Sequence, residues 1–478
     1  MCSSFRSNMD LEKPHPNNSS ASPFHPVQMA IVVLGLISGV AYFFNFRLQS
    51  VLGATSGIDF YVFVFLTLSL LYLIAIALIF KYRDMWQRSK SGVSIIILFA
   101  VMFRIFLVPA DPTALSKDMY RYIWDGRVQQ NGINPYRHPP DADVLKKQRD
   151  DQVYPNINRK SHPTLYPAGA QLFFRLFHMI VGDSVFGYKG LMTLFDVLTL
   201  FVLLALLRIY QYEDGRLLIY AWNPLVVFEI AYSGHLEGLT VFWMVLAFFF
   251  SATNKRTAGV AALAVASAIK LYPALLLPAL LSRSQRIKGC LTFAITMVLL
   301  YLPFLGAGRK VLGFLPIYLQ NPYESFNLGL KFVLMQLWPQ IDYSLWSIFF
   351  LLGLMAAAVF VFFKNKHPTQ TIRYAFILIG LLIVLMPASL HPWYIIILIP
   401  FLCFYPAIAW LLFSCLVTLS YVKYVTPTGI MPTWVLMLEY GLLFALLAGG
   451  FIMRCITRKE GGVGVINGQK DAYFLMRL

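Results

Sequence analysis

The chain has 478 residues, of which 58% are hydrophobic and only 13% are charged. A soluble domain usually carries about 25% charged residues, so this composition excludes a protein built around one large soluble core. The formal net charge of +17 comes from short basic clusters between apolar runs, a pattern typical of cytoplasmic loops. It therefore argues for the lipid bilayer, and against nucleic acid, as a partner.

The amino-terminal 26 residues are polar and rich in Pro, Asn and Ser, which predicts a disordered cytoplasmic tail. The apolar run 27–46 follows. It is too long for the apolar core of a cleaved signal peptide and lacks a small-residue cleavage site, so we expect a retained first span. The five Cys residues show no metal-ligand spacing, and neither a zinc site nor a disulfide framework is predicted.

The rest of the chain alternates between long apolar runs and short polar loops. A membrane-spanning helix needs about 20 mostly apolar residues, which predicts an all-α polytopic membrane protein. Thirteen runs qualify: 27–46, 59–80, 93–109, 187–207, 217–233, 238–252, 258–281, 289–305, 343–363, 374–389, 393–404, 406–422 and 433–453.

The run 258–281 decides the predicted topology. Both its flanks are basic, and its centre carries Lys270 and Pro273. A charge at mid-bilayer is costly and a proline interrupts a helix, so we interpret this run as a re-entrant hairpin. With the hairpin, most Lys and Arg residues of the short loops fall on the cytoplasmic side. A single crossing would move every later basic cluster to the other side.

The resulting prediction is 12 full spans plus the hairpin, with both termini cytoplasmic. One transmembrane domain would cover residues 27–455, followed by a cytoplasmic tail, 456–478. Two long loops would face outward, a first loop at 110–186 and a second at 306–342. The segment Leu165–Val181 of the first loop is apolar and aromatic, with Arg175 and His178 interspersed, which predicts an interfacial amphipathic helix.

This topology brings unusual polar residues from five separate segments to the outer side. They lie in the runs Ser116–Gly126 with Gly132–Tyr136, Ser233–Gly238, Lys270–Pro273, Asn321–Asn327 and His391–Tyr394. A carboxylate there can accept a proton from an attacking hydroxyl, and Lys or Arg can hold a phosphate. Trp and Tyr can contact sugar rings at headgroup depth. The set suits transfer from an anionic, lipid-borne donor.

The acidic and basic candidates also have plain structural alternatives. Asp118 could cap a short surface helix, Asp125 precedes Gly126 in a pair typical of turns, and Asp111 before Pro112 could cap a turn. Arg104 could extend its charge to the interface. Lys270 needs a partner at its depth.

The remaining polar candidates have alternatives of the same kind. His235, Glu237, Glu324 and His391 could pair locally. Tyr136, Tyr166 and Trp393 could be interfacial anchors alone.

The run Asp118-x2-Arg121-Tyr122-x-Trp124-Asp125-Gly126, followed by Gly132-x-Asn134-Pro135-Tyr136, resembles the first outer loop of a known family. It is the polyprenyl-phosphate-sugar-dependent glycosyltransferases of the GT-C membrane superfamily, and the resemblance is strongest to bacterial mannosyltransferase-like members. Weaker matches follow in order: Asn223-Pro224, Gly234-His235 with Glu237, Lys270-x-Tyr272-Pro273, Asn321-Pro-Tyr323 with Asn327, and His391-Pro-Trp393-Tyr394. Together they span roughly residues 93–430.

The resemblance implies transfer of a hexose, mannose in the nearest members, from polyprenyl phosphate to a glycan or glycolipid acceptor, with inversion. The enzyme would lie in the bacterial inner (plasma) membrane with its site on the extracytoplasmic face. Asp118 would be the base, with Asp125 as a second catalytic candidate, and Arg104, Lys270 and Arg121 would bind the donor phosphate. The expected substrate contacts are Tyr122, Trp124, Asn134, Tyr136, His235, Glu237, Tyr272, Tyr323, Glu324, His391 and Trp393.

Three positions depart from the family pattern: Lys117, Leu236 and Ala168. Lys117 stands where related chains often have an acid beside the key Asp, so neither a metal nor another cofactor is predicted.

Two other functions are compatible with parts of the pattern. A secondary transporter would share the broken hairpin and the midplane lysine, but it would not account for the dense Asp/Trp/Tyr run of the first outer loop. Another surface-facing lipid transferase, such as a ligase or a phosphoethanolamine-type enzyme, would require a nucleophilic Thr or Ser among metal ligands in a sizeable soluble domain. The sequence contains no such domain.

Overall fold

The computed structural model describes residues 25–49, 54–316, 326–365 and 370–460. Within these ranges the regular secondary structure is helical throughout and no strand occurs. In a bilayer an unpaired backbone N–H or C=O has no water to bind, and a helix satisfies these groups internally. The predicted all-α class is confirmed.

Eight helical stretches in the described part of the chain are long and apolar enough to cross a membrane, which confirms a polytopic membrane protein. They are α1 (Pro26–Gln49), α2 (Ala54–Lys81), α3 (Lys90–Leu107), α6 (Val185–Ile209), α12 (Arg286–Tyr301) with its flanking turns, α15 (Tyr343–Lys364), α18 (Ile408–Leu416) with η12 (Val417–Val425), and α19 (Thr433–Leu436) through η13 (Met437–Gly441) to α20 (Leu442–Glu460).

The other predicted spans are shorter or broken in the structure. They include α9 (Glu237–Ala252), α16 (Thr371–Val384), and η11 (Pro392–Leu398) with α17 (Ile399–Leu402). The run 217–233 is divided into η5 (Asp214–Leu217), α7 (Leu218–Ala221), α8 (Pro224–Val227) and the π-helical turn η6 (Phe228–Tyr232). Pro224 cannot donate a backbone hydrogen bond, and the Asn223 side chain instead accepts one from Leu225 N at 3.0 Å.

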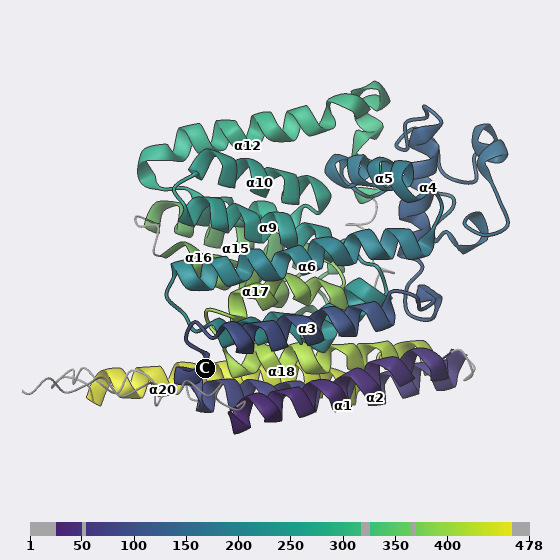
Figure 1. Cartoon of the computed structure of the whole chain (residues 1–478). Coiled ribbons are helices and arrows are strands. Elements are labelled where there is room, and N and C mark those ends of the chain that lie inside the picture. Colours follow the sequence, from purple (N-terminus) through teal and green to yellow (C-terminus); the bar gives the residue numbers. More distant parts are fainter. Residues whose placement is uncertain (1–24, 50–53, 317–325, 366–369, 461–478) are drawn as a thin grey trace, which may run out of the picture.

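The broken stretch lies in the middle of the molecule, since all residues from 214 to 241 are buried. Around it, α12, α10, α9, α6, α3, α1 and α2 form a row of neighbouring helices (Figure 1). Irregular backbone at membrane depth is tolerated where protein covers it, and the row of helices provides that cover.

The segment 258–281 doubles back, as predicted. Helix α10 (Arg256–Ile269) ends at Lys270, and the chain continues through η7 (Tyr272–Leu276) and α11 (Leu277–Leu280). Arg256 Nη1 then donates a hydrogen bond to Ser282 Oγ at 2.9 Å. The two ends of the segment therefore meet, with the Lys270 break at the opposite end of α10.

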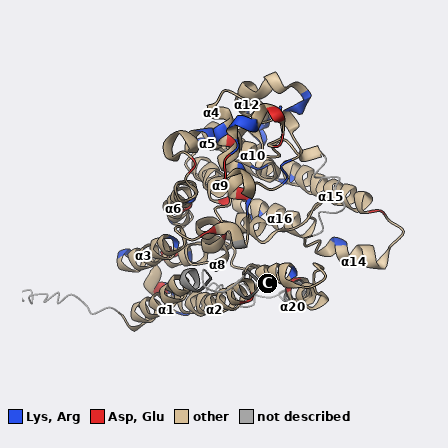
Figure 2. Cartoon of the chain, turned by 90° about the vertical axis from the view of Figure 1, so that its right-hand side faces the viewer, with Lys and Arg blue, Asp and Glu red and all other residues tan. Residues whose placement is uncertain are grey.

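The first long loop carries short helices, as predicted. They are η2 (Pro112–Ala114), α4 (Asp118–Gln130), η3 (Asp143–Gln148), η4 (Tyr154–Asn156) and α5 (Ala168–Val181). Helices α4 and α5 lie together at the upper right in Figure 1, near the right-hand ends of α6 and α10. Viewed from that end, most of the ribbon is uncharged, and coloured acidic and basic segments gather around α4, α5 and α9 (Figure 2). The second loop contains η9 (Leu302–Leu312) and α14 (Leu330–Leu337).

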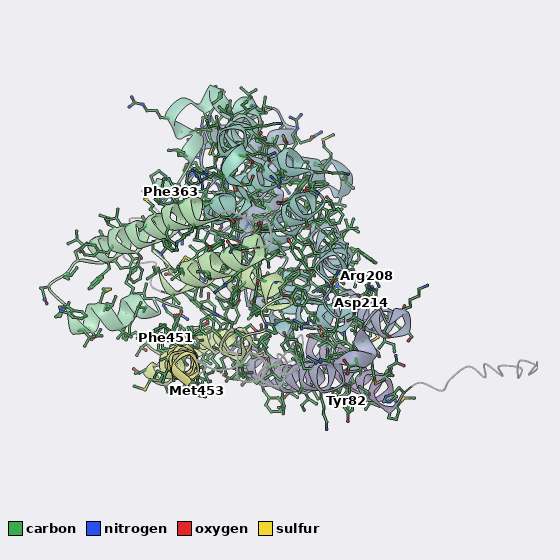
Figure 3. All side chains as sticks on the ribbon, turned by 90° about the vertical axis from the view of Figure 1, so that its left-hand side faces the viewer. Tyr82, Arg208, Asp214, Phe363, Phe451 and Met453 are labelled. Atoms are coloured by element: carbon green, nitrogen blue, oxygen red, sulfur yellow. The ribbon has the colours of Figure 1, made fainter. Side chains whose placement is uncertain are left out.

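At the carboxyl end of α6, Arg208 forms a bidentate pair with Asp214 (Figure 3). The Nη2–Oδ2 distance is 2.7 Å and the Nε–Oδ1 distance is 3.0 Å. Asp214 begins η5 and Arg208 lies in the last turn of α6, so the pair ties the broken central stretch to a full span. Paired guanidinium and carboxylate groups of this geometry are among the stronger ion pairs.

Candidate active site

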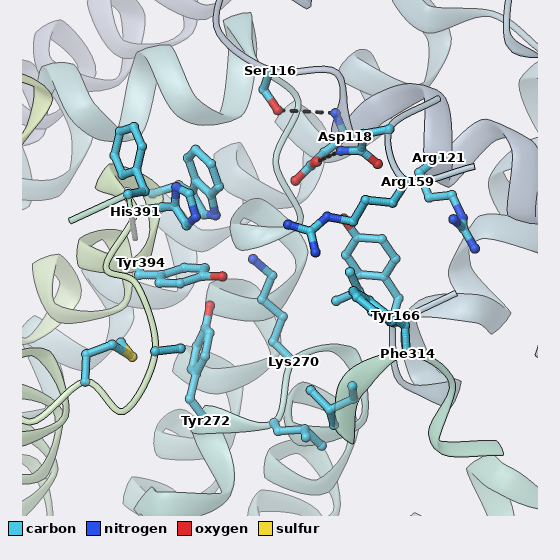
Figure 4. A pocket seen from close by; sticks show the side chains of 18 of the residues that line it. Ser116, Asp118, Arg121, Arg159, Tyr166, Lys270, Tyr272, Phe314, His391 and Tyr394 are labelled. Carbon is cyan, nitrogen blue, oxygen red and sulfur yellow. Dashed lines mark hydrogen bonds between the residues drawn. The ribbon is translucent and has the colours of Figure 1, made fainter. Parts of the chain in front are cut away.

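A cavity of about 780 Å³ opens where the first loop, the hairpin and the loop after α16 meet (Figure 4). One wall comes from the start of α4 and from residues 158–167, and the hairpin contributes Lys270, Leu271 and Tyr272. The remaining walls come from the second loop, through Phe314, Leu315 and Phe326, and from α15, α16, the segment 386–394 and η12. Segments far apart in the sequence thus build one concave site, the usual form of a small-molecule site.

Asp118 lies at the first position of α4 and lines this cavity. Its backbone N–H donates to Ser116 Oγ at 3.2 Å, and its Oδ1 accepts a hydrogen bond from Asn158 Nδ2 at 2.7 Å. The other carboxylate oxygen, Oδ2, is 3.9 Å from His235 Nδ1. Lys117, not Asp118, is the capping residue of α4, and it makes no side-chain cap. The carboxylate is therefore oriented by its neighbours and retains access to the cavity.

Lys270 lies at the hairpin break, where the backbone is extended between α10 and η7. Its Nζ is bonded to Glu237 Oε1, and Tyr272 donates to the same oxygen at 3.2 Å. Nζ also lies 5.1 Å from the centre of the Tyr394 ring. Glu237 is fully buried, so it supplies the partner that a lysine at this depth requires.

A column of four aromatic rings forms another wall. His235 stacks on Trp393 with centroids 4.0 Å apart, Trp393 on His391 at 4.4 Å, and His391 on Phe326 at 4.7 Å. Both faces of Trp393 are therefore covered, so it presents only its edge to the cavity. Burial, together with the charges of His235 and Lys270, lowers the pKa of His391 to about 3, which keeps that ring neutral at physiological pH.

The charges around the cavity are mostly positive. Of the lining residues that the structure describes, the Lys and Arg side chains are Lys117, Arg121, Arg159, Lys270 and Lys423, and the carboxylate is Asp118. In Figure 4 the side chain of Arg159 is seen between Asp118 and Lys270. Clustered cations of this kind favour an anionic ligand such as a phosphate.

Asp118, Arg121, Lys270, Tyr272, His391 and Trp393 are the expected site residues that line the cavity. Arg104 does not. It is fully buried between α3 and α6, where Nε is 2.5 Å from Asp196 Oδ2, and Nη1 donates to the backbone oxygens of Ala100 and Ala221 at 2.9 Å. This geometry makes Arg104 a structural residue inside the helix row, neither a cavity residue nor a charge at the interface.

Asp125 is also directed away from the cavity. It lies inside α4 and not in a turn; its Oδ1 pairs with Arg121 Nε at 2.9 Å, and Gln171 donates to Oδ2 at 2.8 Å. Both carboxylate oxygens are thus used within the protein, Oδ1 inside α4 and Oδ2 between α4 and α5. The ion pair with Asp125 also holds Arg121 in place, and Arg121 Nη1 donates a second hydrogen bond to His162 O at 3.2 Å.

The other expected residues of the first loop also pack within the protein and do not line the cavity. The ring of Tyr122 stacks on Phe174, and Trp124 packs against Tyr154. Asn134 donates to Phe304 O at 3.1 Å, and the Tyr136 hydroxyl donates to Tyr166 O at 2.7 Å. These contacts hold the first loop together and join it to η9.

His235 and Glu237 are fully buried behind the cavity wall. His235 contacts Asp118, and Glu237 contacts Lys270, so both lie one side chain away from the cavity. Tyr323 and Glu324 lie outside the described residues.

The cavity also contains residues that were not predicted as site residues, among them Asn158, Arg159, Lys423 and, as a ring beside Lys270, Tyr394. Tyr394 ends the run His391–Tyr394, so its motif was a usable signal. Asn158 and Arg159 lie in a polar part of the first loop that matches no motif, and only the three-dimensional path of that loop brings them to Asp118.

The model of one protein family matches residues 27–285, more than half of the chain, and is described as the alpha-(1->6)-mannopyranosyltransferase N-terminal domain. The chain belongs to this mannosyltransferase family. The match contains Asp118, Arg159 and Lys270, and it ends before the ring column from Trp393 to Phe326. The predicted kinship with GT-C-type mannosyltransferases is thereby confirmed, and the protein is a membrane glycosyltransferase. No curated protein matches the chain.

Proposed function

We propose that this mannosyltransferase takes mannose from a polyprenyl-phosphate donor and passes it, with inversion, to a glycan or glycolipid acceptor on the non-cytoplasmic face. The observation that carries the proposal is the division of the cavity into two kinds of wall. Asp118, Arg159 and Lys270 line one part, whereas Leu351 and Leu354 of α15 line another. A lipid with an anionic head group needs a charged wall for the head group and an apolar wall for the chain.

The apolar part also has exposed residues. Leu271 and Leu351 line the cavity, and their exposed fractions are 41% and 44%. Helix α15 is long and apolar enough to span a membrane, and other large apolar side chains on it, Phe349, Leu352 and Met355, are also exposed, as on a helix that faces lipid. A polyprenyl chain that stays in the bilayer can therefore reach the cavity from this side while its phosphate meets the cations.

The transfer follows from the positions of the charged groups. An acceptor hydroxyl attacks the anomeric carbon and gives its proton to Asp118, while the bond from that carbon to the phosphate oxygen breaks. The departing polyprenyl phosphate gains negative charge, which Arg159 and Lys270 stabilise. Because the new and the broken bonds lie on opposite faces of the anomeric carbon, the configuration inverts.

Asp118→Asn tests the base directly. It keeps the size of the side chain and removes its basicity, so mannosyl transfer from labelled polyprenyl-phosphate mannose should fall by roughly 10²- to 10⁴-fold. Asp111→Asn is the matched control, because Asp111 is an exposed aspartate that caps a short turn through Thr113 N and does not line the cavity. Its rate should remain that of the wild type.

Two results would contradict the proposal. Wild-type rates in purified, folded Asp118→Asn would exclude this residue as the base. Transfer by the wild type from nucleotide-activated mannose, with none from the lipid-linked sugar, would exclude the polyprenyl-phosphate donor.

A further inference from the structure

Behind Asp118 lies a buried pair that sequence analysis did not assign, His235 with Glu229. Both side chains have no exposed surface. His235 Nε2 is 3.3 Å from Glu229 Oε2, and His235 Nδ1 is 3.9 Å from Asp118 Oδ2. One imidazole therefore lies between two carboxylates, only one of which reaches the cavity.

The backbone of this region is built to hold the pair. Glu229 belongs to the π-helical turn η6, and irregular turns of this kind are frequent at functional sites. Gly234 follows with a φ of +73°, which lets the chain turn back so that His235 N donates to Glu229 O at 2.9 Å. A Cβ on Gly234 would lie 2.1 Å from Met119 Cε, so the turn sits directly against the first turn of α4.

Several polar atoms of the His235–Glu229 pair have no hydrogen-bond partner within the described residues. Glu229 Oε1 accepts a hydrogen bond from Tyr421 at 2.6 Å. In contrast, Glu229 Oε2 and both ring nitrogens of His235 have no hydrogen-bond partner within the described residues. Buried polar atoms without partners are costly. Each ring nitrogen faces a carboxylate oxygen, and an imidazole can donate on both sides only when both nitrogens carry a proton.

We infer that Glu229 and His235 act as positioning residues for the mannosyl transfer proposed above, with Glu229 holding the imidazole as a cation whose Nδ1 orients and stabilises the Asp118 carboxylate. The inference rests on the proposed role of Asp118. His235 was expected to bind substrate, but its complete burial assigns it this supporting role instead.

Other charged or titratable groups also face this array. Tyr421 approaches from η12, His391 lies beyond Trp393 in the ring column, the Glu237–Lys270 pair lies near the same turn, and Lys189 of α6 packs against Gly234. The carboxylate that faces His235 Nε2 is that of Glu229, so neutralising Glu229 should act on the imidazole first.

The test is Glu229→Gln, measured as the dependence of kcat on pH. Removing the carboxylate takes away the partner of His235 Nε2, so the imidazole no longer holds Asp118 Oδ2 in place. The acidic limb of the profile should therefore shift from its wild-type position. The kcat should fall by up to about 100-fold, as misplaced catalytic groups do, while KM for the lipid-linked donor should change less than about twofold because neither residue lines the cavity.

Asp196→Asn is the matched control. Asp196 is also fully buried and ion-paired, with Arg104, but it lies between α3 and α6 away from the cavity. This variant should lower the thermal midpoint and leave the pH profile of kcat unchanged. If Glu229 had only a structural role, Glu229→Gln would likewise lower the thermal midpoint and leave the pH profile of kcat unchanged.

The outcomes separate this inference from the proposed function. If the wild type transfers mannose from the lipid donor and Glu229→Gln keeps its kcat and pH profile, the positioning role is overturned. If the wild type shows no such transfer, the proposed function fails first. Should Glu229→Gln not be recovered folded, Tyr421→Phe decides. It removes one hydrogen bond to Glu229, and an unshifted acidic limb in that variant would overturn the inference.

Discussion

Arg159 has a backbone conformation that is uncommon for its residue type. Its φ is +52°, in the left-handed region that favours glycine. Arg88, Gln211 and Asn254 are the other described non-glycine residues with positive φ, and Arg159 is the one of these four that lines the cavity. Such conformations tend to persist where a site requires them, which supports a role for this guanidinium in holding the donor phosphate.

Removing that guanidinium should weaken donor binding. Charged hydrogen bonds contribute about 1.5–3 kcal/mol, so Arg159→Ala should raise KM for polyprenyl-phosphate mannose by roughly tenfold to 100-fold. Lys147→Ala removes the same charge from an exposed position of the first loop and should leave KM unchanged. An equal effect of the two variants in steady-state kinetics would mean that Arg159 acts only through the overall charge.

Arg104 and Arg159 show how far the sequence can predict which single residues line the cavity. Arg104 was expected near the outer end of a span, where it could contact a phosphate, but its partner Asp196 is 92 residues away in the chain. Nothing in the pattern of either helix reveals that they pair. Asp118 and Lys270 were predictable because they lie in motifs, whereas Arg159 depends on the path of a loop that carries no periodicity.

At the scale of elements, the turn between η6 and α9 positions His235 against α4. Gly234→Ala should impair this turn, because a non-glycine residue in the left-handed region costs about 1–2 kcal/mol. The new Cβ would also displace Met119, the residue after Asp118. We expect a lower thermal midpoint together with a reduced kcat.

Gly132→Ala separates these two effects. Gly132 has nearly the same φ, +74°, but nothing lies within 4 Å of a Cβ placed there. This variant should lose stability through backbone strain alone and keep its kcat. A kcat that falls equally in both variants would show that the close contact at Gly234 has no bearing on catalysis.

The doubling back of the segment 258–281 was predictable from local features, since a central lysine and a proline lie within one apolar run with basic flanks. The interruption of the run 217–233 was not predicted, although Asn223-Pro224 lies inside it and breaks the helix. The charge in that run, Glu229, lies in the π-helical turn beyond the proline and not at the Asn223-Pro224 break, and an interrupted helix buried on all sides keeps the same apolar composition as an intact one.

At the scale of the whole molecule, the sidedness remains a prediction that labelling can test. In a variant lacking Cys2, Cys290, Cys403, Cys415 and Cys455, single cysteines would replace three exposed residues, Val144, Lys255 and Ser284. A membrane-impermeant maleimide should label Val144→Cys on intact cells. It should label the other two only after permeabilisation, because the hairpin returns the chain to the side of Lys255.

Each pattern of labelling has one interpretation. Lys255→Cys and Ser284→Cys reacting from opposite sides would contradict the hairpin, despite the bond between Arg256 and Ser282. Val144→Cys reacting only after permeabilisation would place the cavity on the cytoplasmic side.

The number of full spans was predicted as 12, whereas eight helical stretches among the described residues are long enough to cross a membrane on their own. Helix breaks shorten the other predicted spans.

The column from His235 to Phe326 has a consequence for substrate range. Each inner ring is confined between two others, at interplanar angles of 21°, 10° and 19° along the column, so none can rotate without displacing its neighbours. The segment 158–167 also lines the cavity and belongs to no helix; its buried Tyr166 packs against Tyr122 and Phe174, but Asn158 is exposed. Adaptation to a bulkier acceptor should therefore occur by substitution in that segment, where one side chain can change size without a chain of compensating changes.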